Sequence, residues 1–141
     1  LLILGDGPLK KELEKWCKVH KIESSVTFLG YQKNPYKYMT KCNLFVCSSL
    51  SEGFSTAATE ALIVGIPVCT VDVSGMRELL GDDNEYGVIV NNDEESLFNA
   101  IQSLIENKNQ LEHYKQKALE RGRDFTIENT VKAVETFLMR V

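Results

Sequence analysis

The stretch from residue 44 to residue 71 constrains the fold of this chain more than any other part of the sequence. It opens with the short apolar run Leu-Phe-Val-Cys and closes with a second run, Val-Cys-Thr-Val, and such runs are typical of buried strands. A small polar loop and a segment rich in helix formers lie between them. The order strand, loop, helix, strand indicates a βαβ unit, the building block of a parallel sheet.

A candidate anion site lies at the start of the helix in this unit. We expect the helix to begin between Gly53 and Thr56, and the first N–H groups of a helix lack intrahelical partners. These groups and the helix dipole favour an anion such as phosphate, and Gly53 would let it approach the backbone closely. Glu52 lies directly before this helix start, and Glu60 lies four residues after Thr56, on the same helix face.

Two interpretations of these carboxylates are open. Acidic residues near a helix start are common because they offset the helix dipole, and in that role they need no ligand. Alternatively, a carboxylate beside a bound phosphate can accept hydrogen bonds from a sugar diol. The second interpretation predicts a nucleotide with its diphosphate at the helix start, its ribose at Glu60 and a further group near Glu52.

The same residues resemble a known family. Glu52 and Glu60 are separated by seven residues and lie within Ser-Glu-Gly-Phe-Ser, Glu-Ala-Leu and Gly-Ile-Pro-Val. This resembles the Glu-x7-Glu signature of the family 4 retaining glycosyltransferases, which have the GT-B fold, and several elements of the signature occur in register. The resemblance covers nearly the whole chain. It implies an α/β fold, a Rossmann-like parallel sheet flanked by helices, that forms one half of a GT-B fold.

The resemblance implies further nucleotide-binding residues outside this segment. Gly5 and Gly7 match a Gly-x-Gly-Pro turn at the nucleotide end of the family's sheet, and a helix-capping turn is the alternative interpretation. The Val-Thr-Phe-Leu-Gly segment borders the family's nucleobase pocket, so Phe28, Gly30 and Tyr31 are candidate base contacts. A position in the core is an equally good interpretation for Phe28.

The resemblance also implies a reaction: transfer of a sugar from a nucleoside diphosphate sugar to an acceptor hydroxyl, with retention at the anomeric carbon. The leaving diphosphate gains negative charge, and preorganised N–H donors beside it lower the barrier. We assign this role to the backbone of Gly53, Phe54 and Ser55, with Thr56 at the helix start.

Glu52 is the candidate catalytic residue in this scheme, because in relatives this residue holds hydroxyls of the transferred sugar. Glu60 would hold the ribose diol. No metal and no other cofactor is expected, since the nucleotide sugar is itself the donor substrate. Glycosyltransferases of the other major fold hold a metal with Asp-x-Asp, and this motif is absent from the 141 residues, which fits the metal independence of GT-B enzymes.

The domain organisation also follows from the resemblance. The family has an acceptor-binding half followed by a donor-binding half, and residues 1–141 match most of the second half only. We therefore expect one donor-binding domain from a longer two-domain enzyme. An upstream strand with its basic residues and the acceptor domain would be missing, so this chain alone should bind donor weakly and not turn over. A sugar, lipid-linked or polysaccharide acceptor would bind the missing domain, in polysaccharide or glycoconjugate biosynthesis.

Composition bears on partners and location. The net charge of −4 argues against a nucleic-acid partner, which a basic surface would attract. No apolar run approaches the roughly 20 residues of a membrane span. The four cysteines show no metal-ligand spacing and are expected as buried, reduced thiols. We expect a cytoplasmic protein whose full-length form could contact the inner face of the membrane peripherally.

Three other functions are open. A non-catalytic nucleotide-sugar-binding module, or a subunit of a split transferase, would keep the same site and differ only in its full-length context. A nucleotide-sugar epimerase of the same fold is disfavoured, because such enzymes usually lack the complete pattern around Glu52 and Glu60. A flavodoxin-like interaction domain would bind no nucleotide at all.

Local patterns predict several further features. The third strand is expected over residues 42–47, and Asp93 is expected to cap a helix. Trp16 recurs at helical spacing with other apolar residues and is expected in the core. Arg77 is expected to form a surface salt bridge. The last helix should carry an apolar face formed by Ile127, Val131, Val134, Leu138 and Val141.

Overall fold

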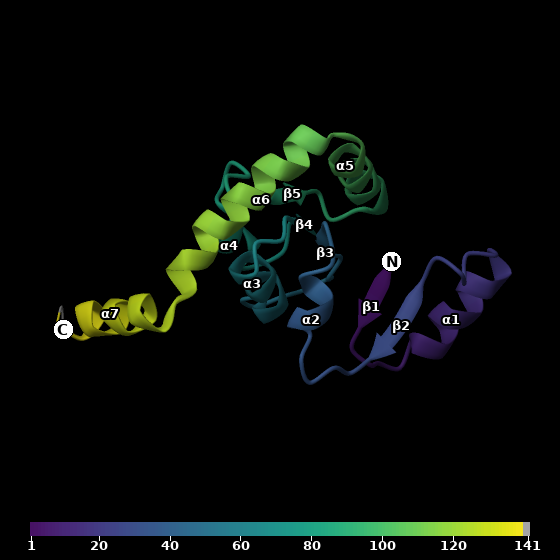
Figure 1. Ribbon diagram of the computed structural model, residues 1–141, viewed down its shortest axis with the longest axis horizontal. Coiled ribbons are helices and arrows are strands. Elements are labelled where there is room, and N and C mark those ends of the chain that lie inside the picture. The colour runs from purple at the N-terminus through teal and green to yellow at the C-terminus, as the bar shows by residue number, and fades with distance from the viewer. Residues whose placement is uncertain (140–141) are drawn as a thin grey trace. The chain divides into compact units, whose positions relative to one another are not determined.

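The computed structural model describes residues 1–139 of the chain (Figure 1). Its contacts divide the chain into two units, Leu1–Lys37 and Tyr38–Val141. The elements follow one another as β1 (Leu2–Leu4), α1 (Lys10–Val19), β2 (Thr27–Gly30), α2 (Tyr36–Met39), β3 (Phe45–Cys47), α3 (Thr56–Ile63), β4 (Val68–Val71), α4 (Met76–Leu80), β5 (Val88–Val90), α5 (Glu94–Glu106), α6 (Lys108–Gly122), the 3₁₀ turn η1 (Arg123–Phe125) and α7 (Ile127–Leu138).

The first unit contains a two-stranded parallel sheet. β1 and β2 pair with Leu2 opposite Thr27 and Ile3 opposite Phe28, and α1 connects the two strands. Parallel neighbours need a crossover of this kind, because the chain must return to the starting edge of the sheet. The first unit is thus built around one βαβ arrangement.

The prediction that Trp16 lies in the core is wrong. Trp16 is 52% exposed, and its ring stacks on His20 of the same helix with 3.9 Å between the ring centroids. The helix turns the neighbouring Cys17 inward instead, and Cys17 is the buried residue of α1. Helical spacing alone identified the apolar side of the helix but did not fix which member faces inward.

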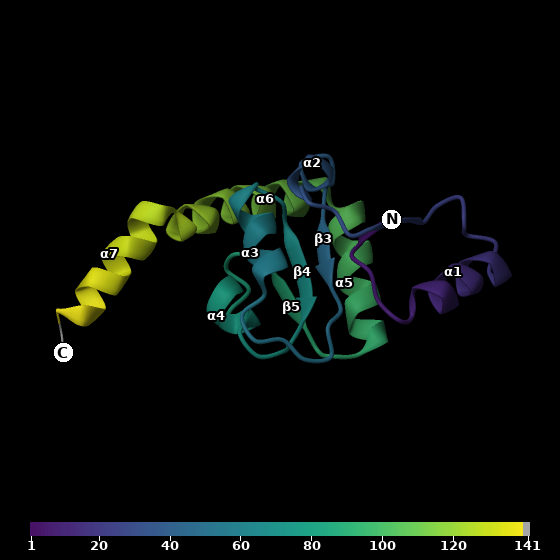
Figure 2. The same ribbon diagram turned by 90° about the horizontal axis from the view of Figure 1, so that it is seen from below.

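The second unit contains a three-stranded parallel sheet in the order β3-β4-β5. All four residues of the central strand β4 are buried. Figures 1 and 2 show α3 and α4 on one face of this sheet and α5 on the other. A parallel sheet covered on both faces gives its strands apolar sequences without alternation, as in the Val-Cys-Thr-Val run. The predicted α/β fold with a parallel sheet flanked by helices is confirmed.

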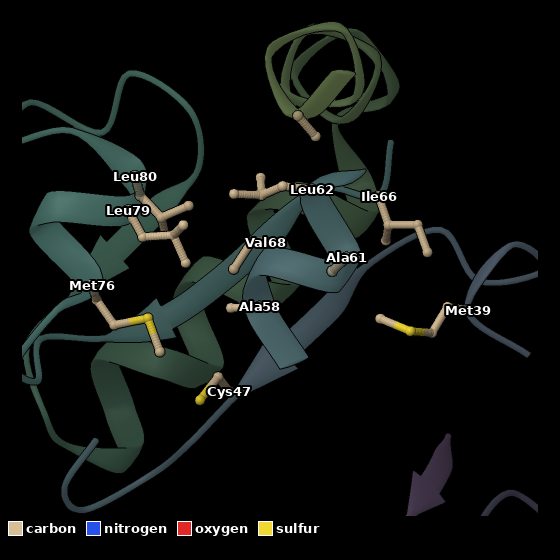
Figure 3. Packing of buried hydrophobic residues seen from close by; sticks show 11 residues of the cluster. Met39, Cys47, Ala58, Ala61, Leu62, Ile66, Val68, Met76, Leu79 and Leu80 are labelled. Carbon is tan, nitrogen blue, oxygen red and sulfur yellow. The ribbon is translucent and has the colours of Figure 1, made fainter. Parts of the chain in front are cut away.

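The core of the second unit lies between this sheet and α3, α4 and α6. Figure 3 shows Leu62 of α3 and Leu80 of α4 directed toward one another beside Val68 of β4. Full burial of a leucine side chain contributes roughly 1.5–3 kcal/mol. The cluster consists of Met39, Cys47, Ala58, Ala61, Leu62, Ile66, Val68, Met76, Leu79, Leu80 and Ala118.

The third strand is shorter than predicted. It begins at Phe45 and not at residue 42, because Cys42 still belongs to the turn that follows α2. The Cys42 backbone N–H donates to the Met39 carbonyl at 2.8 Å, and its thiol donates to the Tyr38 carbonyl at 3.4 Å. These bonds hold Cys42 in a turn, where it is half-buried rather than fully buried.

The ends of the chain's last helices follow the predictions more closely. Asp93 caps α5, since its Oδ1 accepts from the Ser96 N–H at 2.7 Å. α7 carries the predicted apolar residues, and those that the structure describes are exposed, Ile127 by 80%. Val141, the last member of the predicted face, lies outside the described residues.

Within residues 1–139, no helix has the length and apolar character needed to cross a membrane.

Candidate functional site

The candidate site begins where the strands of the second unit end. β3, β4 and β5 are parallel, so their carboxyl ends meet at one edge of the sheet. Ligands of open α/β sheets bind outside the carboxyl ends of the strands. The segment from residue 48 to residue 55 leaves β3 at this edge and leads into α3 (Figure 2).

The predicted helix start is confirmed. α3 begins at Thr56, and Ser55 occupies the capping position with an extended backbone. The Ser55 hydroxyl is buried and accepts from the Ala58 N–H at 3.4 Å, so it satisfies one of the N–H groups that a helix start leaves without a partner. The Ser55 side chain therefore serves the helix itself, and the positive end of the helix dipole faces the turn before it.

Glu52 is held in place by a neighbour that the sequence analysis did not single out. The Ser49 hydroxyl donates to Glu52 Oε1 at 2.7 Å, and Ser49 Oγ lies 3.4 Å from the Cys47 thiol at the end of β3. Glu52 is half-buried. One carboxylate oxygen is thus oriented by a residue tied to the sheet, directly before the Gly53 turn.

The turn at Gly53 rests on the loop that follows β4. Gly75 has a left-handed backbone with a φ of 80°, and a β-carbon there would overlap the carbonyl oxygen of Gly53. The same β-carbon would lie 3.3 Å from the Phe54 Cα. Gly75 therefore allows backbone to pack on backbone. A β-carbon at Gly53 itself would meet no protein atom within 4 Å, so space for a ligand exists on that side.

The remaining predicted residues of this segment differ in exposure. Phe54 is 47% exposed, and its ring meets Phe125 edge-on at a centroid distance of 6.2 Å. Thr56 is exposed and Glu60 is half-buried one helical turn further along α3. The structure therefore brings Glu52 and residues 53–56 into one continuous turn, with Glu60 following on the helix.

The predicted residues of the first unit form a second group. Gly5 follows β1 and Gly30 ends β2, and the Gly5 N–H donates to the Gly30 carbonyl at 2.8 Å. Both have positive φ, 102° and 64°, which favours glycine at each position. Gly7 is exposed, Tyr31 is 77% exposed and Phe28 is half-buried within β2. Gly5 and Gly30 are thus brought together at the carboxyl ends of their strands.

Arg77 forms the predicted surface salt bridge. Its guanidinium donates to Asp72 through Nε at 3.1 Å and Nη2 at 2.5 Å. This hydrogen bond, together with the charge of Arg77, lowers the pKa of Asp72. Within residues 1–139, no group of three or more His, Cys, Asp or Glu side chains could hold a metal ion.

Three residues that support the site were not predicted as site residues: Ser49, Gly75 and Phe125. A hydroxyl three residues before Glu52 is a local signal that could have identified Ser49. Gly75 had no local signal for this role, because its contact with Gly53 joins two different loops. Phe125 had no signal, because its partner Phe54 is remote in sequence.

Comparison with known proteins identifies the class. The fold is that of the GT-B glycosyltransferases. Residues 1–121 match the family described as Glycosyl transferases group 1, and the chain belongs to this family. The predicted glycosyltransferase identity is confirmed at this level.

One curated relative is the N-acetylgalactosamine-N,N'-diacetylbacillosaminyl-diphospho-undecaprenol 4-alpha-N-acetylgalactosaminyltransferase of Campylobacter jejuni. It is 43% identical over 127 residues, which cover 89% of this chain and 34% of the relative. The chain thus spans about a third of the length of this relative.

Two solved structures illustrate the similarity of fold. HepE of Anabaena in complex with UDP superposes with a TM-score of 0.87 at 23% identity, over 99% of this chain and 40% of HepE. A mutant of S. aureus TarM in complex with fondaparinux, alpha-GlcNAc-glycerol and UDP superposes with a TM-score of 0.83 at 26% identity, over 97% of this chain and 28% of TarM.

Proposed function

We propose that this chain is the donor-binding part of a retaining glycosyltransferase, which moves a sugar from a nucleoside diphosphate sugar to an acceptor hydroxyl. The observation that carries the proposal is the Glu52 carboxylate, held by Ser49 directly beside the start of α3. A carboxylate and a set of backbone N–H donors then lie in one turn. A sugar diphosphate presents the two matching chemistries, hydroxyl donors and a polyanion.

The diphosphate would lie at the turn formed by Gly53, Phe54 and Ser55. Backbone N–H groups and the dipole of α3 favour negative charge there, and the leaving diphosphate gains charge as the sugar departs. Gly75, in the loop after β4, fixes this turn by packing directly on its backbone. The donors are therefore oriented before the reaction and need little rearrangement, which is the condition for electrostatic stabilisation of a transition state.

Each of the two glutamates would bind one of the two sugars of the donor. Glu52, on the sheet side of the turn, would accept hydrogen bonds from hydroxyls of the transferred sugar. Glu60, one turn into α3, would accept from the ribose diol, since a carboxylate so close to a phosphate is better placed beside it than against it. For the base, Phe28, Tyr31 and the glycine turns at Gly5 and Gly30 of the first unit remain the candidate contacts that the family resemblance implies.

The nucleobase and the acceptor class are inferred from the comparisons. UDP is the nucleotide in the complexes of HepE and TarM, so we propose a uridine diphosphate sugar as donor. The name of the Campylobacter relative contains a diphospho-undecaprenol acceptor, and we extend the proposal to a lipid-linked acceptor in glycoconjugate assembly. The transferred sugar, the acceptor and the transfer reaction are proposed for the whole enzyme, of which this chain would form the donor-binding part.

A nucleotide titration followed by NMR tests the proposal. The labelled chain is titrated with UDP, GDP and ADP to millimolar concentration, together with Glu60→Ala. We expect UDP to shift the amide signals of Gly53, Phe54, Ser55 and Thr56 and the Glu60→Ala variant to require more UDP for the same shift. Glu95→Ala, on the exposed first turn of α5, is the matched control and should bind like the parent chain.

Other outcomes of the titration would contradict the proposal. Shifts confined to α5 or α6, or shifts that Glu60→Ala leaves unchanged, would contradict the assigned site. The absence of any shift with all three nucleotides would favour the interaction-domain alternative.

A further inference from the structure

The ring of Phe125 reaches the proposed phosphate turn from a distant part of the chain. Phe125 ends η1, between α6 and α7, and its ring meets that of Phe54 edge-on, with a centroid distance of 6.2 Å and an interplanar angle of 61°. Edge-to-face pairs of this geometry are attractive and directional. Phe54 precedes the helix cap Ser55 directly, so this contact acts on the backbone of the turn itself.

Phe125 is itself held in place by contacts with the rest of the second unit. It packs against the hydrophobic cluster of the second unit, and the guanidinium of Arg121 lies 5.3 Å from the centroid of its ring. Arg121 donates to the carbonyls of Glu78 and Leu79 at 2.7 and 3.0 Å. These carbonyls belong to the end of α4, where a helix leaves its last acceptors without intrahelical partners. The ring of Phe125 is thus fixed by a charged side chain anchored on a neighbouring helix.

The end of α6 also fixes the position of η1 relative to α3. A β-carbon at Gly122 would lie 2.5 Å from the Leu62 carbonyl oxygen and 2.9 Å from the Ile63 Cα. The backbone of α6 therefore touches the backbone at the end of α3. Phe125 follows three residues later and contacts Phe54 just before the same helix begins.

We infer that Phe125 is a positioning residue for nucleotide binding. It holds Phe54 and, through it, the N–H groups of Phe54 and Ser55 in the orientation that a diphosphate requires. Gly75 supports the turn on its backbone, and Phe125 supports it through the Phe54 side chain. The inference rests on the proposed function, since it assigns Phe125 to the phosphate turn of that site. Small displacements of preorganised donors weaken the binding they provide.

A purely structural role is the alternative for Phe125. In that case its removal would lower the stability of the whole unit and affect signals throughout the core, with no special effect at the turn. The two roles differ in where the structure changes and in whether an aromatic ring is required. An experiment with graded substitutions separates them.

The test compares Phe125→Leu, Phe125→Tyr and Phe54→Leu in the labelled chain, with UDP as the probe. Without nucleotide, Phe125→Leu should shift the amide signals of residues 53–55 while the methyl signals of Leu104 stay in place. It should weaken UDP binding by about three- to tenfold, the range of an aromatic pair. Phe125→Tyr keeps the ring and should restore affinity. Phe98→Leu removes an aromatic ring that is 62% exposed on α5 and is the matched control.

The double variant completes the test. If the rings act as a pair, Phe54→Leu combined with Phe125→Leu should lose less affinity than the two separate losses add up to. Two results would overturn the inference. The first is a Phe125→Leu variant with unchanged amide signals at residues 53–55 and unchanged UDP affinity. The second is a double variant whose loss of affinity equals the sum of the two separate losses. If the parent chain binds no UDP, the proposed function fails, whereas the amide shifts still decide whether Phe125 positions the turn.

Discussion

Gly75 and Gly53 lie backbone against backbone, and no side chain fits between them. A β-carbon at Gly75 would overlap the Gly53 carbonyl oxygen, and the φ of 80° at Gly75 is itself unfavourable for other residues. The loops that follow β3 and β4 are joined at this point. The turn before α3 is therefore braced by a contact that tolerates no added atom.

Replacement of Gly75 should destabilise the chain. In Gly75→Ala the methyl group must displace the Gly53 turn, and the left-handed backbone adds strain, so we expect a loss of about 1–3 kcal/mol in the free energy of unfolding. Urea unfolding measures this loss from the shift in midpoint. Ser74→Ala, at the exposed neighbouring position, should stay within about 0.5 kcal/mol. Equal midpoints for Gly75→Ala and the parent chain would show that the contact is not made.

Replacement of Gly53 should separate binding from stability. A β-carbon at Gly53 meets no protein atom within 4 Å and its φ is not positive, so Gly53→Ala should change the stability by no more than about 0.5 kcal/mol. If a diphosphate lies against this turn, the methyl group obstructs it. We expect roughly tenfold weaker UDP binding, about 1.4 kcal/mol, measured by NMR titration. Undiminished affinity in this variant would place the diphosphate elsewhere.

Much of the local structure could be predicted because its causes are local. The start of α3 at Thr56 follows from a capping serine before helix formers, and the cap at Asp93 follows in the same way. The position of Trp16 could not be predicted, because helical periodicity does not determine which apolar residue of α1 faces inward. The turn at Cys42, between α2 and β3, depends on hydrogen bonds that apolar composition does not reveal.

The cap at Asp93 should give stability that depends on pH. Hydrogen bonds from the Ser96 N–H and hydroxyl hold the pKa of Asp93 below its ordinary value of 3.8. A carboxyl with a lowered native pKa stabilises the fold above the unfolded-state pKa, and this contribution is lost as the pH falls through the lower native pKa. The difference in thermal midpoint between the parent chain and Asp93→Ala should therefore be full at pH 6 and shrink below about pH 4.

Asn107 provides a matched control for this pH dependence. It caps α6 with a neutral side chain, whose Oδ1 accepts from the Gln110 N–H at 3.1 Å. The loss in Asn107→Ala should be the same at pH 6 and pH 3.5, because no titrating group is removed. A loss in Asp93→Ala that is equally constant over this range would contradict the role of the Asp93 charge.

The four thiols should differ in reactivity. Burial raises the pKa of Cys69 to about 11, so almost none of it is thiolate near neutral pH, and it is inaccessible in β4. Cys42 is half-buried in the turn after α2. With iodoacetamide at pH 7.5, mass spectrometry should find Cys42 modified first and Cys69 last, and all four should react in urea. Modification of Cys69 before Cys42 in the folded chain would contradict the packing of β4.

The candidate site was predictable in part. Glu52, Gly53 and Glu60 could be chosen as candidates because they lie along one strand–loop–helix segment, which the structure confirms. The supports of that segment could not, because Gly75 and Phe125 reach it through tertiary contacts made by later elements. Sequence patterns thus identify which residues could meet a ligand, and the fold identifies which residues hold them.

The most direct test of the account asks whether Glu60 binds the ribose. The affinities of UDP and 2′-deoxy-UDP are measured for the parent chain, for Glu60→Ala and for the control Glu95→Ala. Because hydrogen bonds to a charged group contribute about 1.5–3 kcal/mol, the parent chain and the control should prefer UDP by about tenfold or more, and Glu60→Ala should bind both nucleotides equally. A parent chain without this preference, or a preference that persists in Glu60→Ala, would contradict the proposed donor site.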